Sequence, residues 1–274
     1  MIVELKKEEF WKCRELVNEH VQIEAIAVIE SINPGRIFVD DQKHPLTGLI
    51  WLGNNDGFIF FGDEQNEKFN REINGFIDSV IVPEARKVQL EWFEGVGNHE
   101  RWNEVIKHVF DHRQLGSWVQ RVYTLKRSDY YLHSEPVINV DYDVIKIEKS
   151  LFKDDLIKNI DFLKGKLLEF WTSIEDFLDT GIGYCIIHQN EVVSICFSGF
   201  VVGNVHCINI ETLKPHQGKK LAQLVAHHFV NECLKNNAVP YWDCMEMNKP
   251  SVAVAENLGF EKVFEYVGYE FLLE

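Results

Sequence analysis

The order of elements in the second half of the chain restricts the fold most. Three segments rich in β-branched and aromatic residues, separated by short polar turns, predict antiparallel strands at 184–188, 192–200 and 205–213. The pattern then predicts a helix at 221–234, a strand at 240–245, a helix at 251–258 and a strand at 262–271. Antiparallel hairpins followed by strand–helix–strand units predict an α/β fold (α+β) with a mixed sheet.

The first half predicts a comparable mixture of helices and strands. Helical patterns cover 7–17, 64–81 and 100–110, and strand patterns cover 36–40, 49–52, 58–61, 88–93 and 119–125. A polar stretch with proline, His133-Ser134-Glu135-Pro136, separates the two halves. We therefore predict two domains, residues 1–136 and residues 137–274.

The charge of the chain excludes one class of partner. The formal net charge is −15, and 16 Lys and Arg against 23 Asp and Glu in residues 1–136 give −7, whereas 12 against 20 in residues 137–274 give −8. Because neither half is basic, we do not expect a nucleic-acid partner. An acidic protein attracts cationic small molecules such as amines, although charge that serves only solubility gives the same count.

Hydropathy and cysteine spacing indicate a cytoplasmic protein. No apolar run reaches the roughly 18–20 residues of a membrane helix, and charges occupy the first ten residues, where a signal peptide is apolar. None of the six cysteines forms a CxxC pair, and no clustered metal-ligand spacing is present. We therefore expect neither a membrane partner nor a bound metal.

The stretch from Ile208 to Ala222 is the strongest candidate for chemistry. A strand ends, a short loop with a glycine and two consecutive lysines follows, and an amphipathic helix begins at once. Such a turn leaves backbone N–H groups without partners at the positive end of the helix dipole. It is therefore suited to binding a phosphate or pyrophosphate, although any α/β fold contains plain loops of this kind.

With the downstream residues, this stretch resembles the GNAT superfamily of acetyl-CoA-dependent N-acetyltransferases. Gln217–Ala222 stands where the family has its Gln/Arg-x-x-Gly-x-Gly/Ala pyrophosphate loop. Asn248 and, twelve positions later, the Phe260 of a Gly-Phe pair match the second family signature. The runs ETLKPHQGKKLA, PYWDC and NKPSVAVAENLGF are most similar to the bacterial subgroup that includes zwittermicin A resistance acetyltransferases. The resemblance covers residues 137–274.

Two positions depart from the family pattern. Lys220 replaces the second glycine of the loop; a lysine there can still offer its N–H if its φ is negative, and it adds a positive charge. Ala255 occupies the place of the tyrosine that usually acts as general acid, seven positions after Asn248. Tyr241, Cys244 and Tyr266 are alternative proton donors that the sequence does not rank.

The resemblance implies a direct attack of an amine on the thioester of acetyl-CoA. It implies the following cofactor-binding residues: Ile210, Thr212, Gln217, Gly218, Lys219, Lys220, Leu221, Ala222, Asn248 and Ser251. His206 and Glu211, on the strand before the loop, are the candidates for the base that deprotonates the amine. As an alternative, each is an ordinary half-buried or solvated side chain.

Two further hypotheses stay open. Because the family tyrosine is absent, the chain could be a catalytically silent CoA-binding or regulatory protein. A plain α/β interaction domain is the other hypothesis.

The first half follows roughly the element order of the second, which predicts two acetyltransferase-like domains in tandem. Its counterpart of the loop, residues 62–67, carries three carboxylates that would repel a pyrophosphate. We therefore predict a degenerate first domain that binds no CoA; an unrelated α/β cap is the alternative.

Overall fold

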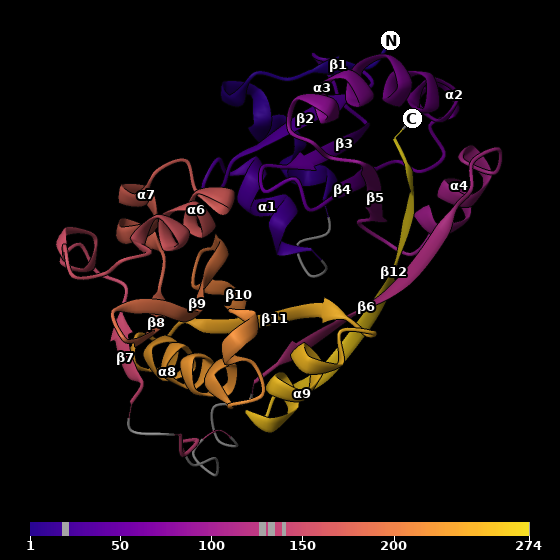
Figure 1. The fold of residues 1–274 in the computed structure, drawn as a ribbon. Coiled ribbons are helices and arrows are strands. Elements are labelled where there is room, and N and C mark those ends of the chain that lie inside the picture. The colour runs from indigo at the N-terminus through magenta and orange to yellow at the C-terminus, as the bar shows by residue number, and fades with distance from the viewer. Residues whose placement is uncertain (18–21, 126–129, 131–134, 139–140, 274) are drawn as a thin grey trace. The chain divides into compact units, whose positions relative to one another are not determined.

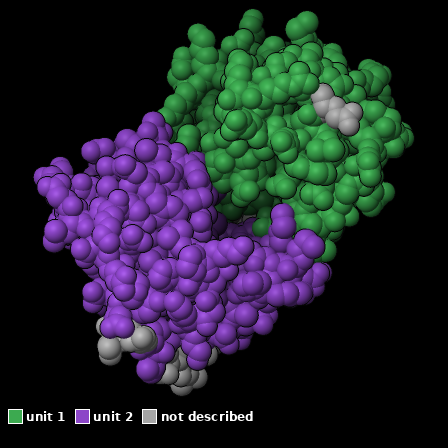
Figure 2. Space-filling model, in the orientation of Figure 1, with its two compact units in different colours: residues 1–120, 266–274 green, residues 121–265 purple. Residues whose placement is uncertain are grey.

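The structure is a computed structural model that describes residues 1–17, 22–125, 130, 135–138 and 141–273. His133 and Ser134 of the predicted boundary lie outside the described residues. The chain forms two compact units, one of Met1–Gln120 with Tyr266–Glu274 and one of Arg121–Glu265 (Figure 2). In the described part of the chain, no helix is long and apolar enough to cross a membrane.

The first unit is a mixed sheet with helices (Figure 1). Its strands are β1 (Val3–Glu4), β2 (Gly35–Val39), β3 (Thr47–Leu52), β4 (Phe58–Gly62), β5 (Trp92–Gly97), the start of β6 (Gly116–Thr124) and the end of β12 (Glu261–Leu272). Its helices are the 3-10 helix η1 (Lys7–Leu16), α1 (Ile23–Ile29), α2 (Glu67–Phe76), the π-helix η2 (Ile77–Ile81), α3 (Val82–Lys87) and α4 (Trp102–Val109).

The second unit has the same kind of architecture. Its strands are the end of β6, β7 (Asp143–Lys146), β8 (Gly183–His188), β9 (Glu191–Val202), β10 (Val205–Thr212), β11 (Val239–Met245) and the start of β12. Its helices are α6 (Ile160–Phe170), α7 (Ile174–Thr180), α8 (Leu221–Lys235), α9 (Lys249–Asn257) and the short 3-10 turns η3 (Leu151–Lys153) and η4 (Lys214–His216). The predicted α/β fold with a mixed sheet is confirmed.

The two units repeat one pattern of strand pairing. In the first unit β1, β2, β3 and β4 pair antiparallel in this order, and β4 pairs with β5 in parallel. In the second unit β7, β8, β9 and β10 pair antiparallel, and β10 pairs with β11 in parallel. A helical segment follows the fourth strand in both, and α4 and α9 follow the fifth. The predicted parallel between the halves is therefore present in strand order and direction.

The last strand of each unit departs from a simple tandem order. The strand order is β1-β2-β3-β4-β5-β12 in the first unit and β6-β11-β10-β9-β8-β7 in the second. Residues 268–272 of β12 pair antiparallel with β5, so the chain end belongs to the first unit. The contacts thus divide the chain after Gln120 and again after Glu265, not after residue 136 as predicted, because β6 and β12 each run from one unit into the other.

In the second unit, helices cover both faces of the sheet. Leu224 and Phe229 of α8 and Ala255 of α9 share one buried cluster with Ile208 and Cys244 of the strands. On the opposite face, Phe170 of α6 and Phe177 of α7 make edge contacts with Phe197 of β9, with ring centroids 5.6 and 6.1 Å apart. Side chains of β10 therefore alternate between a face under α8 and α9 and a face under α6 and α7.

The fifth strand of the first unit is shifted from its predicted position. The sequence predicted a strand at 88–93, but Val88 follows the end of α3 and β5 is Trp92–Gly97. Gly95 and Gly97 suggest a break by composition, yet packing requires glycine there. A Cβ on Gly95 would lie 2.5 Å from Cε1 of Phe93, and one on Gly97 would lie 2.2 Å from Cβ of Trp102.

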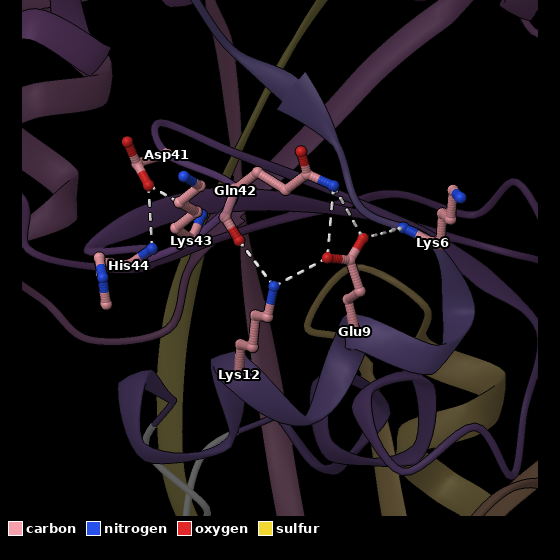
Figure 3. Close-up of polar contacts among 7 residues, drawn as sticks. All are labelled: Lys6, Glu9, Lys12, Asp41, Gln42, Lys43 and His44. Carbon is pink, nitrogen blue, oxygen red and sulfur yellow. Dashed lines mark hydrogen bonds and ion pairs between the residues drawn. The ribbon is translucent and has the colours of Figure 1, made fainter.

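A polar network fixes η1 to the turn that follows β2 (Figure 3). The Glu9 carboxylate accepts hydrogen bonds from Lys12 Nζ at 2.8 Å and from Gln42 Nε2 at 3.0 Å. Lys12 Nζ also donates to the Gln42 carbonyl at 2.9 Å. The hydrogen bonds from Lys12 and Gln42 lower the pKa of Glu9 to about 2. This network anchors a 3-10 helix, whose own hydrogen-bond geometry is poor.

Candidate functional site

The two parallel strands of the second unit separate partway along their length. β10 pairs with β11 from Val205 to Cys207, opposite Val239 to Tyr241, and both strands then continue, to Thr212 and Met245. A bulge at Gly199 of β9, opposite Cys207 and Ile208, marks the same level. Beyond Cys207, the edge of β10 that faces β11 is therefore open to an extended ligand that needs backbone partners.

The loop after β10 adopts an irregular backbone. Gly218 and Lys220 both have left-handed conformations, with φ of 77° and 63°. The negative φ under which Lys220 was expected to offer its N–H is therefore absent: the lysine has a left-handed conformation, which glycine adopts more readily. This conformation costs a non-glycine residue about 1–2 kcal/mol, so the surrounding loop must impose it.

The start of α8 offers several backbone donors. The first bond of the helix runs from the Leu224 N–H to the Lys220 carbonyl at 3.0 Å. Among the described residues, no side chain caps this end, since Lys220 at the N-cap position makes no capping bond. The N–H groups of Leu221 and Ala222 are thus available at the positive end of a fifteen-residue helix, which favours an anion.

A cavity of about 660 Å³ joins these features. Its walls come from the end of β10, the loop, the first turn of α8 and one side of α9. The lining includes Ile210, Glu211, Thr212, His216, Gln217, Gly218, Lys220, Leu221, Ala222, Gln223, Asn248, Pro250, Ser251, Val254 and Asn257. Nine of the ten predicted cofactor-binding residues line it; the tenth, Lys219, does not.

The loop, the first residue of α9 and the wall of the cavity carry lysines without acidic partners; of these, Lys220 lines the cavity. Within the described ranges, Lys214, Lys219, Lys220 and Lys249 take part in no ion pair, whereas Lys146 and Lys166 of the same unit pair with carboxylates. In a chain of net charge −15, four cations without acidic partners on the loop and at the start of α9 favour a local positive field. This field suits a ligand with several phosphate charges.

Side-chain bonds hold the two ends of the loop. Gln217 Nε2 donates to the Thr212 carbonyl at 3.0 Å, and the Thr212 hydroxyl lies 2.7 Å from the Ser194 hydroxyl of β9. Because the Thr212 carbonyl already accepts a bond from Gln217, Thr212 is less suited than Ile210, the other predicted cofactor-binding residue of this strand, to offer a backbone partner to an extended ligand.

Asn248 and Ser251 both line the cavity and both support α9. The Asn248 side chain caps the helix by accepting from the Ser251 N–H at 3.3 Å. The Ser251 hydroxyl accepts from Nε1 of buried Trp242 at 3.1 Å. Ala255, at the position of the family tyrosine, is completely buried under α8. A proton donor for a thiolate must therefore come from elsewhere.

Lys219 belongs to a cluster that the sequence did not predict. Its ammonium donates to the Tyr142 hydroxyl at 3.0 Å, and that hydroxyl lies 3.1 Å from Nδ1 of His216. The Tyr142 ring stacks on His188, with centroids 4.5 Å apart. Tyr142 and His188 are far from the loop in sequence, so no local signal could have joined them. The cluster ties the loop to the edge of the sheet.

The two predicted base candidates lie in different places. Glu211 lines the cavity, and its carboxylate is 3.0 Å from Lys166 Nζ of α6. His206 lines a second cavity of about 760 Å³ with Asn204, Glu232 and Asn236, at the other end of β10. His206 is four residues before Ile210, about 13 Å along a strand. The structure therefore brings Glu211 to the loop but not His206.

Burial makes His206 a weak base. Its side chain is 7% exposed, and Nδ1 lies 2.8 Å from the Ser198 hydroxyl. Burial lowers the pKa of His206 to about 4, because desolvation disfavours the imidazolium.

This shift gives a pH dependence of stability with a known sign. The folded pKa lies below the ordinary value of about 6.5, so the unfolded state binds more protons between about pH 6.5 and 4, and stability is lost as the pH falls through this window. Between pH 7 and pH 5, we expect the free energy of unfolding to fall by about 2 kcal/mol less in His206→Gln than in wild type, because the variant lacks this titrating group. Urea unfolding at the two pH values measures the difference. Equal pH slopes for both proteins would contradict the assignment.

The first unit fills the corresponding place with its own side chains. Asn66 caps α2 by accepting from the Phe69 N–H at 3.2 Å. Glu64, 4% exposed, lies 3.4 Å from Arg101 and 3.6 Å from His99. Phe60 is the last residue of β4 that pairs with β5, and β4 ends only two residues later, at Gly62. No open strand edge comparable to that of β10 precedes this helix in the described residues.

Comparisons with known proteins agree with these features. The profile of the family described as GNAT acetyltransferase matches residues 14–269. The uncharacterized N-acetyltransferase YdfB of Bacillus subtilis (strain 168) is 28% identical over 248 residues, which are 89% of this chain and 88% of that protein. The similarity therefore extends beyond the second half, to which the sequence motifs were confined. The zwittermicin A subgroup stays a prediction.

Solved structures share the whole fold. A GCN5-related N-acetyltransferase-like protein from Streptococcus suis 89/1591 superposes with a TM-score of 0.69 at 19% identity, over 96% of this chain and 98% of that one. A tandem GNAT protein from the clavulanic acid biosynthesis pathway superposes with a TM-score of 0.64 at 12% identity, over 100% and 98%. At these identities the likeness concerns the fold, and it is the fold of a tandem protein.

Proposed function

We propose, from the premise that the chain belongs to the GNAT acetyltransferase family, that it is an N-acetyltransferase whose second unit binds acetyl-CoA. The family implies an acyl-CoA donor. The observation that carries the proposal is the conjunction, in one cavity, of an open strand edge, an uncapped helix start and Lys220, which takes part in no ion pair with the described residues. The pyrophosphate would bind at the Gly218–Ala222 backbone, and the pantetheine arm would follow β10.

The acceptor would be the amine of a small molecule. The nitrogen attacks the thioester carbonyl directly, which requires a neutral amine and hence a group that removes one proton. Of the two base candidates, Glu211 lines the donor cavity and is the better placed. The acidic chain and the resemblance to zwittermicin A resistance acetyltransferases both favour a cationic, antibiotic-like amine.

One observation favours a second candidate, a catalytically silent CoA-binding protein. The family tyrosine is replaced by Ala255, which is buried and has no proton to give. Such a protein would bind CoA in the same cavity without turning over acetyl-CoA. Binding and turnover must therefore be measured separately.

Titration calorimetry with CoA tests the binding site. We expect one CoA per chain, because the second unit has the open edge and uncapped helix start whereas Asn66 and Glu64 occupy the equivalent place in the first. Two sites would show that the first unit also binds CoA. Absence of any binding would contradict the donor assignment.

Release of CoA thiol from acetyl-CoA, followed with panels of polyamines and aminoglycosides, tests catalysis. Acceleration by an amine, together with an acetylated product in mass spectrometry, is the expected result. Binding of one CoA without turnover by any amine would favour the silent alternative.

A further inference from the structure

The proposed reaction leaves the source of one proton open. When the C–S bond breaks, the CoA sulfur leaves as a thiolate, and protonation of this group assists its departure. The position of the usual donor holds Ala255. Of the three alternative donors, Tyr241, Cys244 and Tyr266, the geometry of the strand edge distinguishes the first.

The level at which the sulfur would lie follows from the open strand edge. The five residues Ile208 to Thr212 run beyond the paired part of β10, a length of about 16 Å at about 3.3 Å per residue. A pantetheine arm extended from the loop along this edge must stop where β10 and β11 join. The joining residues are Cys207 and Tyr241.

Strand alternation sets the direction of the Tyr241 side chain. Trp242 and Cys244 are buried in the cluster under α8 and α9. Successive side chains of a strand point to opposite faces, so Tyr241 projects from the other face, on which Phe197 packs against α6 and α7. Tyr241 is half-buried. A ligand that lay between the two strands would be bounded by side chains from both faces of the sheet.

The same geometry disfavours Cys244. Its thiol is 6% exposed, faces the core, and burial raises its pKa. Cys244 also lies three residues past the junction, on the face away from Tyr241.

We propose that the Tyr241 hydroxyl donates the proton taken up by the CoA sulfur; this inference rests on the proposed acetyl transfer. The amine nitrogen forms a bond to the carbonyl carbon, the C–S bond breaks, and its electron pair takes the phenolic proton. The proton released by the amine nitrogen returns to the phenolate through solvent. In sum, one proton moves from nitrogen to sulfur, and Tyr241 is unchanged after the cycle.

Tyr241→Phe tests the proposal while keeping the ring. We expect kcat for acetyl-CoA consumption, measured with the best amine and with water as acceptor, to fall by about 10²-fold, within the range of general acid catalysis. KM for acetyl-CoA should stay within about 3-fold of wild type, since the hydroxyl stabilises the transition state alone. For the same reason, the rise in melting temperature caused by CoA should stay within about 1 °C of the wild-type value. We expect kcat of the wild type to fall at high pH, where a phenolic donor loses its proton, and this fall should be absent in the variant.

Tyr184→Phe is the matched control. Tyr184, also half-buried in a strand, lies on β8, two strands from the gap, and its hydroxyl donates to Glu232 at 3.2 Å. The Tyr184→Phe substitution should leave kcat unchanged. A Tyr241→Phe protein with kcat within 3-fold of wild type overturns the inference but not the proposed function. The same conclusion follows if kcat falls by about 10²-fold in Cys207→Ala or Tyr266→Phe while Tyr241→Phe keeps the wild-type kcat. Wild type without turnover in either assay overturns both.

Discussion

Replacement of Gly218 and Lys220 by aspartate should abolish binding of CoA. Both residues line the cavity, and both have the left-handed conformation that aspartate tolerates better than most residues. The change adds two negative charges and removes one positive charge where a pyrophosphate would lie, a net change of −3. At an effective dielectric of about 20, two like charges about 5 Å apart repel by about 3 kcal/mol, so we expect at least a 10³-fold loss of affinity.

Thermal stabilisation measures this loss. A ligand at about 100 times its Kd stabilises a protein by about 2.7 kcal/mol, and after a 10³-fold loss of affinity almost nothing remains. The control is Gly203→Asp with Lys235→Asp, which makes the same charge change at the other end of β10 and α8. Gly203 also has a positive φ, 56°, and open space around its Cα, like Gly218. Equal stabilisation of both double variants by CoA would show that the loop does not bind the pyrophosphate.

The second half could be predicted from the sequence because its signals are local. Each predicted strand and helix from residue 184 onward is present, with ends shifted by at most two residues. Gly218 and the lysines that follow it mark the loop, and alternation of apolar residues marks the strands on either side. These patterns depend on neighbours in the chain, so a single sequence carries them.

A helix that is buried on all sides, such as α1, gave no such signal. Ile23–Ile29 is buried along its entire length, and a short apolar run of this kind does not distinguish a helix from a strand. The first-unit strand Trp92–Gly97 was misplaced because its glycines suggest a turn until the rings around them are known. In both cases tertiary packing decides what local propensity leaves open.

The location of the base candidates was equally beyond the sequence. His206 and Ile210 belong to one strand and one face, yet His206 reaches the end of α8 near Glu232 while Ile210 reaches its beginning. Which end of β10 opens depends on where β11 stops pairing, a contact between residues about thirty-five positions apart. The intrinsic pKa that favoured His206 is also displaced by a burial that only the fold reveals.

The end of β12 pairs with β5 and contributes to the core of the first unit. The variant Phe93→Ala tests how much the stability of this unit depends on that contact. Phe93 of β5 is 1% exposed and stacks between Phe58 of β4 and Phe271 of β12, with ring centroids 4.4 and 4.7 Å away. Its removal leaves a cavity between three strands, so we expect the free energy of unfolding to fall by about 3–5 kcal/mol. The lost ring stacking, about 0.5–1.5 kcal/mol for each pair, is part of this cost.

Urea unfolding of Phe93→Ala beside Trp92→Ala checks this expectation. Trp92 precedes Phe93 on the same strand, points to the other face and is 42% exposed, so truncation of this larger side chain should cost less than about 1 kcal/mol. Because the proposed CoA cavity is lined by residues between 210 and 257, CoA affinity of the folded Phe93→Ala protein should stay within about 3-fold of wild type. Equal costs for the two truncations would contradict a core that depends on β12, since only Phe93 contacts Phe271 through its ring face.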